Sequence, residues 1–135
     1  MKEEEKENLY ITFQQTIESI IKDKRKYPKH EKLLNNFKAN INLGLQIEED
    51  YYFWVNLIAK EGNFSLNKGK LDEYDLEVMA DPEDLLFFVN GENSILHMVL
   101  KKNRFGFRKL RFSKGSSGKN NFGILLKLPK VLVLD

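Results

Sequence analysis

The stretch of sequence that decides the fold runs from Tyr74 to Phe107 and reads YDLEVMADPEDLLFFVNGENSILHMVLKKNRFGF. Its first residues alternate in polarity with a period of two, which predicts a β-strand with one buried face. Asp81 and Pro82 then begin a helix, because Asp81 can accept hydrogen bonds from the first-turn amides and Pro82 has no amide to lose there. Gly91 stands where a left-handed residue ends a helix. The pattern therefore predicts a strand that leads directly into a short helix.

The predicted helix is apolar on nearly every side, since Leu85–Val89 is an unbroken run of large apolar residues. A second apolar run follows at Ile95–Leu100 and ends at Lys101 and Lys102. One sheet contact does not bury both runs. Two interpretations stay open: the two helices complete an ordinary core, or they wall an apolar cavity.

Length and composition indicate one domain. A chain of 135 residues buries a core without crosslinks, and the absence of cysteine excludes disulfides and thiolate chemistry and fits a reducing compartment. Met1–Glu5 is too acidic for a signal peptide, and no apolar run approaches the roughly 18 residues of a membrane span. We expect a soluble cytoplasmic domain in which residues 1–8 are disordered.

Charge is distributed unevenly along the chain. Residues 1–100 hold 12 Lys and Arg against 19 Asp and Glu, a net charge of −7, whereas residues 101–135 hold 10 against Asp135 alone, a net charge of +9. A basic segment with so much apolar content suggests an anionic partner such as lipid head groups, nucleic acid or an acidic protein.

The rest of the chain predicts an α+β fold. We expect an amphipathic helix over residues 9–27, and then the sheet, the helix pair and a C-terminal lid segment within residues 33–134. The three strands that meander before the strand at Tyr74 are predicted over 37–47, 52–59 and 64–70, and a fifth strand over 104–113. Residues 122–134 are apolar, and we expect Pro129 to divide them into two short pieces.

This order resembles the sterol carrier protein-2 family of lipid-binding domains. The resemblance covers roughly residues 33–134, preceded by the predicted N-terminal helix, and its most specific part is the junction of Asp75–Val78, the capped helix and Asn90-Gly91. It implies a five-stranded, mixed, mainly antiparallel sheet covered on one face by helices, with an apolar tunnel for a fatty acyl chain, phospholipid or sterol-like ligand. It implies no catalysis.

On this basis the chain is predicted to bind, and to transfer between membranes, a hydrophobic small molecule such as a fatty acid, an acyl-CoA, a phospholipid, or a sterol or isoprenoid-like lipid. The predicted ligand-binding residues are Phe87, Phe88, Ile95, Met98, Val99, Leu125, Leu128 and Leu132, the last three forming a lid. The residues predicted to contact an anionic membrane surface are Lys101, Lys102, Arg108, Arg111, Lys127 and Lys130.

The alternative is an interaction module with a filled core that docks or dimerises through its apolar C-terminal segment. Nucleic-acid binding is less favoured, although arginines interleave with phenylalanines between Arg104 and Phe112. His30 and His97 stand far apart and no serine has a nucleophile-elbow context, so the sequence predicts no catalytic residue, metal site or cofactor.

Overall fold

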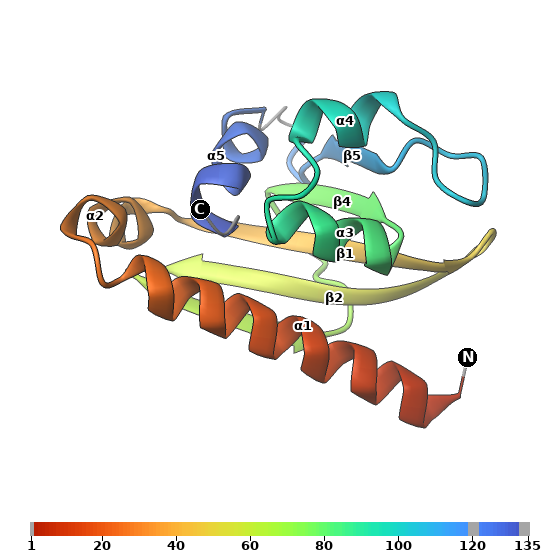
Figure 1. The fold of residues 1–135 in the computed structure, drawn as a ribbon, viewed down its shortest axis with the longest axis horizontal. Helices are drawn as coiled ribbons and strands as arrows, with labels where there is room; N and C mark the ends of the chain where they lie inside the picture. The colour runs from red at the N-terminus through yellow and green to blue at the C-terminus, as the bar shows by residue number, and fades with distance from the viewer. Residues whose placement is uncertain (1, 119–121, 133–135) are drawn as a thin grey trace.

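The computed structural model describes residues 2–118 and 122–132. Its elements in chain order are α1 (Glu3–Lys24), α2 (Pro28–Asn36), β1 (Ala39–Glu48), β2 (Tyr51–Lys60), β3 (Asn63–Lys68), β4 (Leu76–Ala80), α3 (Pro82–Val89), α4 (Ile95–Leu100), β5 (Leu110–Lys114) and α5 (Phe122–Leu132). The strands form one sheet, and α1, α3 and α5 lie on the same side of it (Figure 1). The α+β architecture predicted from the sequence is confirmed.

The five-stranded sheet has the order β3-β2-β1-β4-β5. β1, β2 and β3 form the predicted antiparallel meander, and β4 pairs antiparallel with β5. β4 lies parallel to β1, because the chain leaves β3 at one edge and crosses to the far side of β1 before it re-enters the sheet. The sheet is therefore mixed and mainly antiparallel.

Buried asparagines hold this crossover against the sheet face opposite the helices. Asn42, which is fully buried, donates from Nδ2 to the Leu71 carbonyl at 3.1 Å and accepts at Oδ1 from the Leu71 amide at 2.8 Å. Asn56 Nδ2 donates to the Gly69 carbonyl at 3.0 Å. Buried polar groups need such partners, so the polar positions of the strands serve to anchor the connection.

The other face of the sheet packs against the helices and forms the core. Alternate strand residues such as Ile41, Leu57 and Val78 are 0–3% exposed, and α1 contributes Phe13 and Ile17, one turn apart. Side chains four positions apart share one face of a helix. The period of two in the strands and the helical spacing in α1 thus direct one continuous apolar layer inward.

The N-terminal helix differs from its prediction at both ends. It begins at Glu3 and not at Leu9, so the segment predicted to be disordered is helical from Glu3 onward. Glutamates in a first turn interact favourably with the positive end of the helix dipole. The helix ends at Lys24, before the predicted end at residue 27, and Pro28 begins a second helix, α2, that was not predicted.

The fifth strand is shorter than predicted, because residues 104–109 form a loop before β5. Asn103 Oδ1 accepts hydrogen bonds from the amides of Phe105 and Phe107 at 2.9 and 3.1 Å, and Gly106 adopts a φ of 86°. A side chain that takes up backbone amides in this way competes with strand pairing. The alternation of Phe105 and Phe107 was therefore a misleading strand signal.

The prediction that Pro129 would divide the C-terminal segment is wrong. α5 is continuous from Phe122 to Leu132. A proline inside a helix removes one backbone hydrogen bond, and here the loss falls near the end of the helix. Leu128 and Val131, which flank this position, are 6% and 0% exposed, so their burial offsets the missing bond.

Candidate functional site

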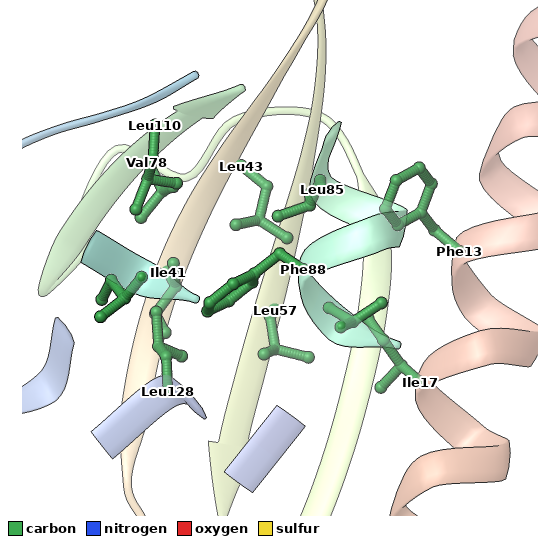
Figure 2. A pocket seen from close by; sticks show the side chains of 12 residues that line it. Phe13, Ile17, Ile41, Leu43, Leu57, Val78, Leu85, Phe88, Leu110 and Leu128 are labelled. Atoms are coloured by element: carbon green, nitrogen blue, oxygen red, sulfur yellow. The ribbon is translucent and has the colours of Figure 1, made fainter. Parts of the chain in front are cut away.

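An apolar pocket lies between the helical face of the sheet and the helices that cover it (Figure 2). Every residue that lines it is apolar: Phe13, Ile17, Ile41, Leu43, Leu57, Val78, Leu85, Phe88, Val89, Ile95, Leu110 and Leu128. In Figure 2, Phe88 reaches inward from α3, while Phe13 and Ile17 project from α1. The pocket is a candidate site for the hydrocarbon part of a ligand.

The regular structure of the sheet explains why the lining is apolar. Leu57, Ile41, Val78 and Leu110 stand on four adjacent strands, β2, β1, β4 and β5, and all belong to the inward-facing set of alternating residues. The pocket consequently runs across the strands. With neighbouring strands about 4.8 Å apart, the sheet lining spans about 14 Å.

The pocket is nearly closed in this conformation. The space that the centre of a water-sized sphere can reach within it is about 40 Å³. A single water needs roughly 10–15 Å³ by that measure, and drug-sized ligands occupy pockets of about 300–1,000 Å³. The helices must therefore move apart before a hydrocarbon chain can enter.

The structure brings Phe88, Ile95 and Leu128 of the predicted ligand set together in the pocket. Met98 is fully buried outside the lining, where its sulfur lies 3.9 Å from Asn93 Nδ2, and Val99 packs half-buried against the core. Phe87 is 40% exposed on the outer side of α3, away from the pocket. The side chains of Leu125 and Leu132 lie outside the described residues.

Charged contacts anchor α3, the helix that roofs the pocket. Asp81 Oδ1 accepts from the Glu83 amide at 3.0 Å, and Asp81 Oδ2 pairs with Arg104 Nε at 2.7 Å. Lys109 Nζ lies 3.5 Å from Asp84 Oδ1 and 3.3 Å from His97 Nε2 of α4. The loop before β5 is thereby tied to the first turn of α3.

α5 is attached differently. Its described side chains make no hydrogen bond or ion pair with the rest of the described chain. Among them, Leu128 and Val131 are buried and Ile124 packs against the core. Apolar packing is not directional, so α5 can shift without breaking a polar contact made by those side chains. Among the described side chains, those of α5 thus contribute apolar packing only, whereas α3 is also held by charged contacts.

The residues predicted to meet a membrane surface separate into two groups. Lys101, Lys102, Arg108, Lys127 and Lys130 are exposed. Arg111 is half-buried on the opposite face of the sheet. Its guanidinium donates to Tyr52 Oη and Gln46 Oε1, each at 2.9 Å, and it lies 4.8 Å from the centre of the Phe107 ring.

The contacts of the arginines between Arg104 and Phe112 weaken the case for nucleic-acid binding. Arg104 pairs with Asp81 and lies 4.7 Å from the centre of the Phe105 ring, and Arg111 is engaged as described. Both guanidinium groups are thus used within the protein. Within residues 2–118 and 122–132, no three metal-ligating side chains gather, and no helix has the length and apolar character to cross a bilayer.

Sequence reasoning missed most of the lining. Phe13, Ile17 and the strand residues of the lining lie in segments predicted to be an amphipathic helix and strands, but inward-facing residues of such segments belong to the core whether or not a cavity lies there. Leu85 and Val89 belong to the apolar run Leu85–Val89. In α3 they lie on the same side of the helix as Phe88 and line the pocket, whereas Phe87 does not. The spacing of Leu85, Phe88 and Val89 at i, i+3 and i+4 was the available signal.

Comparison with known proteins gives structural likenesses. No protein-family model and no curated protein sequence matches the chain. The sterol carrier protein domain 2 of Helicoverpa armigera has a TM-score of 0.60 at 12% identity, over 86% of this chain and 81% of that one. Sterol carrier protein 2 from Yarrowia lipolytica, in its apo form, has a TM-score of 0.53 at 14% identity, over 84% of each chain. A crystal structure of sterol carrier protein 2 has a TM-score of 0.50 at 14% identity, over 87% of this chain and 85% of that one. The chain therefore has a sterol carrier protein-2-like fold.

Proposed function

We propose that this chain binds the hydrocarbon part of a lipid in the pocket of Figure 2, without catalysis. The observation that carries the proposal is the lining, in which residues from four strands and four helices are all apolar. The fold shared with sterol carrier protein 2 structures supports the same conclusion. A fatty acid, an acyl-CoA, a phospholipid and a sterol-like molecule all have a part that fits this description.

Hydrocarbon burial alone supplies enough free energy for binding. Each buried methylene contributes about 0.8 kcal/mol, so a dozen contribute about 10 kcal/mol. Loss of ligand motion and the opening of the pocket subtract several kcal/mol from this sum. A dissociation constant of about 1 μM corresponds to about 8 kcal/mol, and we expect affinities near or weaker than this value.

The lid in this proposal is α5. Leu128 is 6% exposed and occupies one wall of the pocket, in a helix whose described side chains are held by apolar packing alone. When α5 moves away, the space that Leu128 fills becomes available to the ligand. Leu125 and Leu132 remain proposed members of the lid.

The proposed function includes approach to a membrane surface, and the charges of the protein favour an anionic one. The basic residues Lys101 and Lys102 follow α4, whose Leu96 and Leu100 are 63% and 54% exposed, and Lys127 adjoins Leu126, which is 54% exposed. Cations beside exposed apolar side chains suit an anionic lipid surface. Co-sedimentation with phosphatidylserine vesicles should fall as salt rises, whereas phosphatidylcholine vesicles should retain little protein.

The deciding experiment is recovery and uptake of lipid. Protein purified without detergent is denatured in organic solvent, and the extract is analysed by mass spectrometry. Delipidated protein is then titrated with diphenylhexatriene, a neutral hydrocarbon whose fluorescence rises on burial. A co-purified lipid or saturable uptake supports the proposal. Folded protein that yields no lipid and takes up no probe would refute it.

A second candidate function is favoured by the small size of the pocket. With about 40 Å³ of free space, the core is close to filled, as an interaction module would have it. Leu126 is 54% exposed on α5 and would then contact a second copy or another protein. Analytical ultracentrifugation distinguishes this function: mass should rise with concentration, and Leu126→Glu should abolish the rise while leaving the circular dichroism spectrum unchanged.

A further inference from the structure

We infer that the ligand is a single-chain lipid whose head is uncharged and forms hydrogen bonds, such as a monoacylglycerol, in preference to one with a carboxylate or phosphate head. The inference rests on the proposed function, because it concerns the head of the molecule whose chain enters the pocket. Since every lining residue is apolar, a polar head is not accommodated inside, where an unpaired charge would cost many kcal/mol. The head must lie where the pocket meets the surface.

A surface cleft lies where α1 passes the end of α3, and its lining includes sequence neighbours of two pocket residues. It is lined by Thr12, Gln15, Thr16, Ser19, Ile20 and Asn90. Thr12 and Asn90 are the sequence neighbours of Phe13 and Val89, which line the pocket itself. The same two helix segments therefore present hydrocarbon to the inside and hydroxyl and amide groups to the outside.

The side chains of this cleft have hydrogen-bond donors and acceptors that the described part of the chain does not use. The Thr12 and Thr16 hydroxyls donate to the carbonyls of Asn8 and Thr12 at 2.8 and 2.7 Å, which leaves both hydroxyl oxygens able to accept. The side chains of Gln15, Ser19 and Asn90 make no hydrogen bond within the described part of the chain. Together they offer donors and acceptors to a head group.

Charge is missing from this junction although charged residues make up 31% of the chain. Residues 8–17 of α1 and residues 85–91 around the end of α3 contain no Asp, Glu, Lys or Arg. The first charged residue after this part of α1 is Glu18, which would repel an anionic head. A carboxylate placed here would gain no cation from the residues that line the cleft.

A second cleft shares Ile17 with the pocket and does contain cations. It lies on the other side of α1 and is lined in part by Glu18, Lys22 and Arg25. Arg25 donates to the Gly62 carbonyl and lies 3.5 Å from Asn35 Oδ1, so its guanidinium is engaged. Lys22 stands one turn from Glu18, so a negative charge lies on the same face of α1 as this lysine. This cleft is therefore the weaker candidate for the head, and Lys22 is the residue that tests it.

The number of strands that the lining crosses sets a length for a linear chain. Its lining crosses β2, β1, β4 and β5 over about 14 Å. An extended hydrocarbon advances about 1.25 Å per carbon, given carbon–carbon bonds of about 1.5 Å, so about eleven carbons span it. Monododecanoylglycerol and dodecanoate make a matched pair with one chain and two different heads.

The experiment is competition for diphenylhexatriene bound to the full, delipidated chain at about pH 8, where dodecanoate is ionised. We expect monododecanoylglycerol to displace the probe at a concentration about tenfold lower than dodecanoate, the effect of one or two additional hydrogen bonds. The double variant Thr16→Val with Ser19→Ala should weaken the glycerol lipid severalfold and leave dodecanoate unchanged. Lys22→Ala should change neither.

Each other outcome has a defined meaning. Tighter binding of dodecanoate, lost on Lys22→Ala, would overturn the inference and place an anionic head in the basic cleft. Equal displacement by both lipids, unchanged in the double variant, would overturn it as well. Failure of the probe to bind folded protein would refute the proposed function itself. Circular dichroism of each variant separates these outcomes from unfolding.

Discussion

Replacing Leu128 with alanine tests whether α5 closes the pocket over a ligand site. Leu128 is 6% exposed and lines the pocket. The substitution removes three carbons, worth about 2.4 kcal/mol of transfer free energy at about 0.8 kcal/mol each. Together with the cavity that remains, a Leu→Ala change in a core costs about 2–5 kcal/mol. We expect the free energy of unfolding of the free protein to fall by about 3 kcal/mol in urea denaturation.

The same variant should bind ligand more tightly. If α5 moves aside when a chain enters, the bound state has already lost the packing of Leu128, so the substitution destabilises the free state more than the bound state. A difference of about 2 kcal/mol corresponds to an affinity about 30-fold higher. Titration with diphenylhexatriene measures this change directly.

Leu34→Ala is the matched control. Leu34 is fully buried in α2 and lies outside the pocket lining, so its truncation should cost similar stability and leave the affinity unchanged. An affinity of Leu128→Ala equal to or weaker than that of the unmodified protein would refute the reasoning. Leu128 would then keep its packing in the bound state, and α5 would not be the lid.

Three further predictions concern the frame that positions the pocket. In Gly44→Ala the new Cβ would lie 2.8 Å from the Trp54 ring, so we expect a loss of about 1–3 kcal/mol in urea denaturation. The loss should shrink in a Trp54→Leu background, and an unchanged loss would contradict the assigned clash. Asp81→Asn keeps an N-cap acceptor for α3, whereas Asp81→Ala does not; alanine should be less stable than asparagine by about 1 kcal/mol, and equal stabilities would show that the cap contributes nothing. In Gly115→Ala the Cβ would meet the Tyr74 carbonyl oxygen at 2.7 Å. Because backbone cannot yield as a flexible side chain does, we expect broadened amide resonances at the β4–β5 junction, and a wild-type spectrum there would contradict this geometry.

The strand-to-helix junction was predictable because its signals are local. Asp81 caps α3 through the Glu83 amide at 3.0 Å, Pro82 takes the first helical position, and Gly91 adopts a φ of 81°. Each of these roles depends on neighbouring residues within one turn. Ser94 likewise begins α4 by accepting from the His97 amide at 3.1 Å.

Two predictions from the sequence, the start of the fifth strand and the break at Pro129, were wrong, and both errors have causes that lie far away in the sequence. Phe105 and Phe107 alternate as a strand would, but Asn103 takes their amides, and the Asn103 side chain is itself held by Gln46 from β1 at 2.9 Å. α5 passes through Pro129 because Leu128 and Val131 are buried against elements distant in sequence. In both cases a tertiary contact outweighs the local preference.

The sequence by itself determined the α+β class, the apolar set of alternate residues in β1, β2 and β4, and the start and end signals of α3, since these depend on the pattern of residues and on backbone groups a few positions apart. Tertiary structure alone decided which apolar residues line the pocket and how much space they leave. Phe87 and Phe88 are adjacent and identical in type, yet Phe88 is 5% exposed in the pocket wall and Phe87 is 40% exposed on the outer side. The space left between packed layers depends on small differences in the positions of many side chains. No local pattern in the sequence encodes those differences.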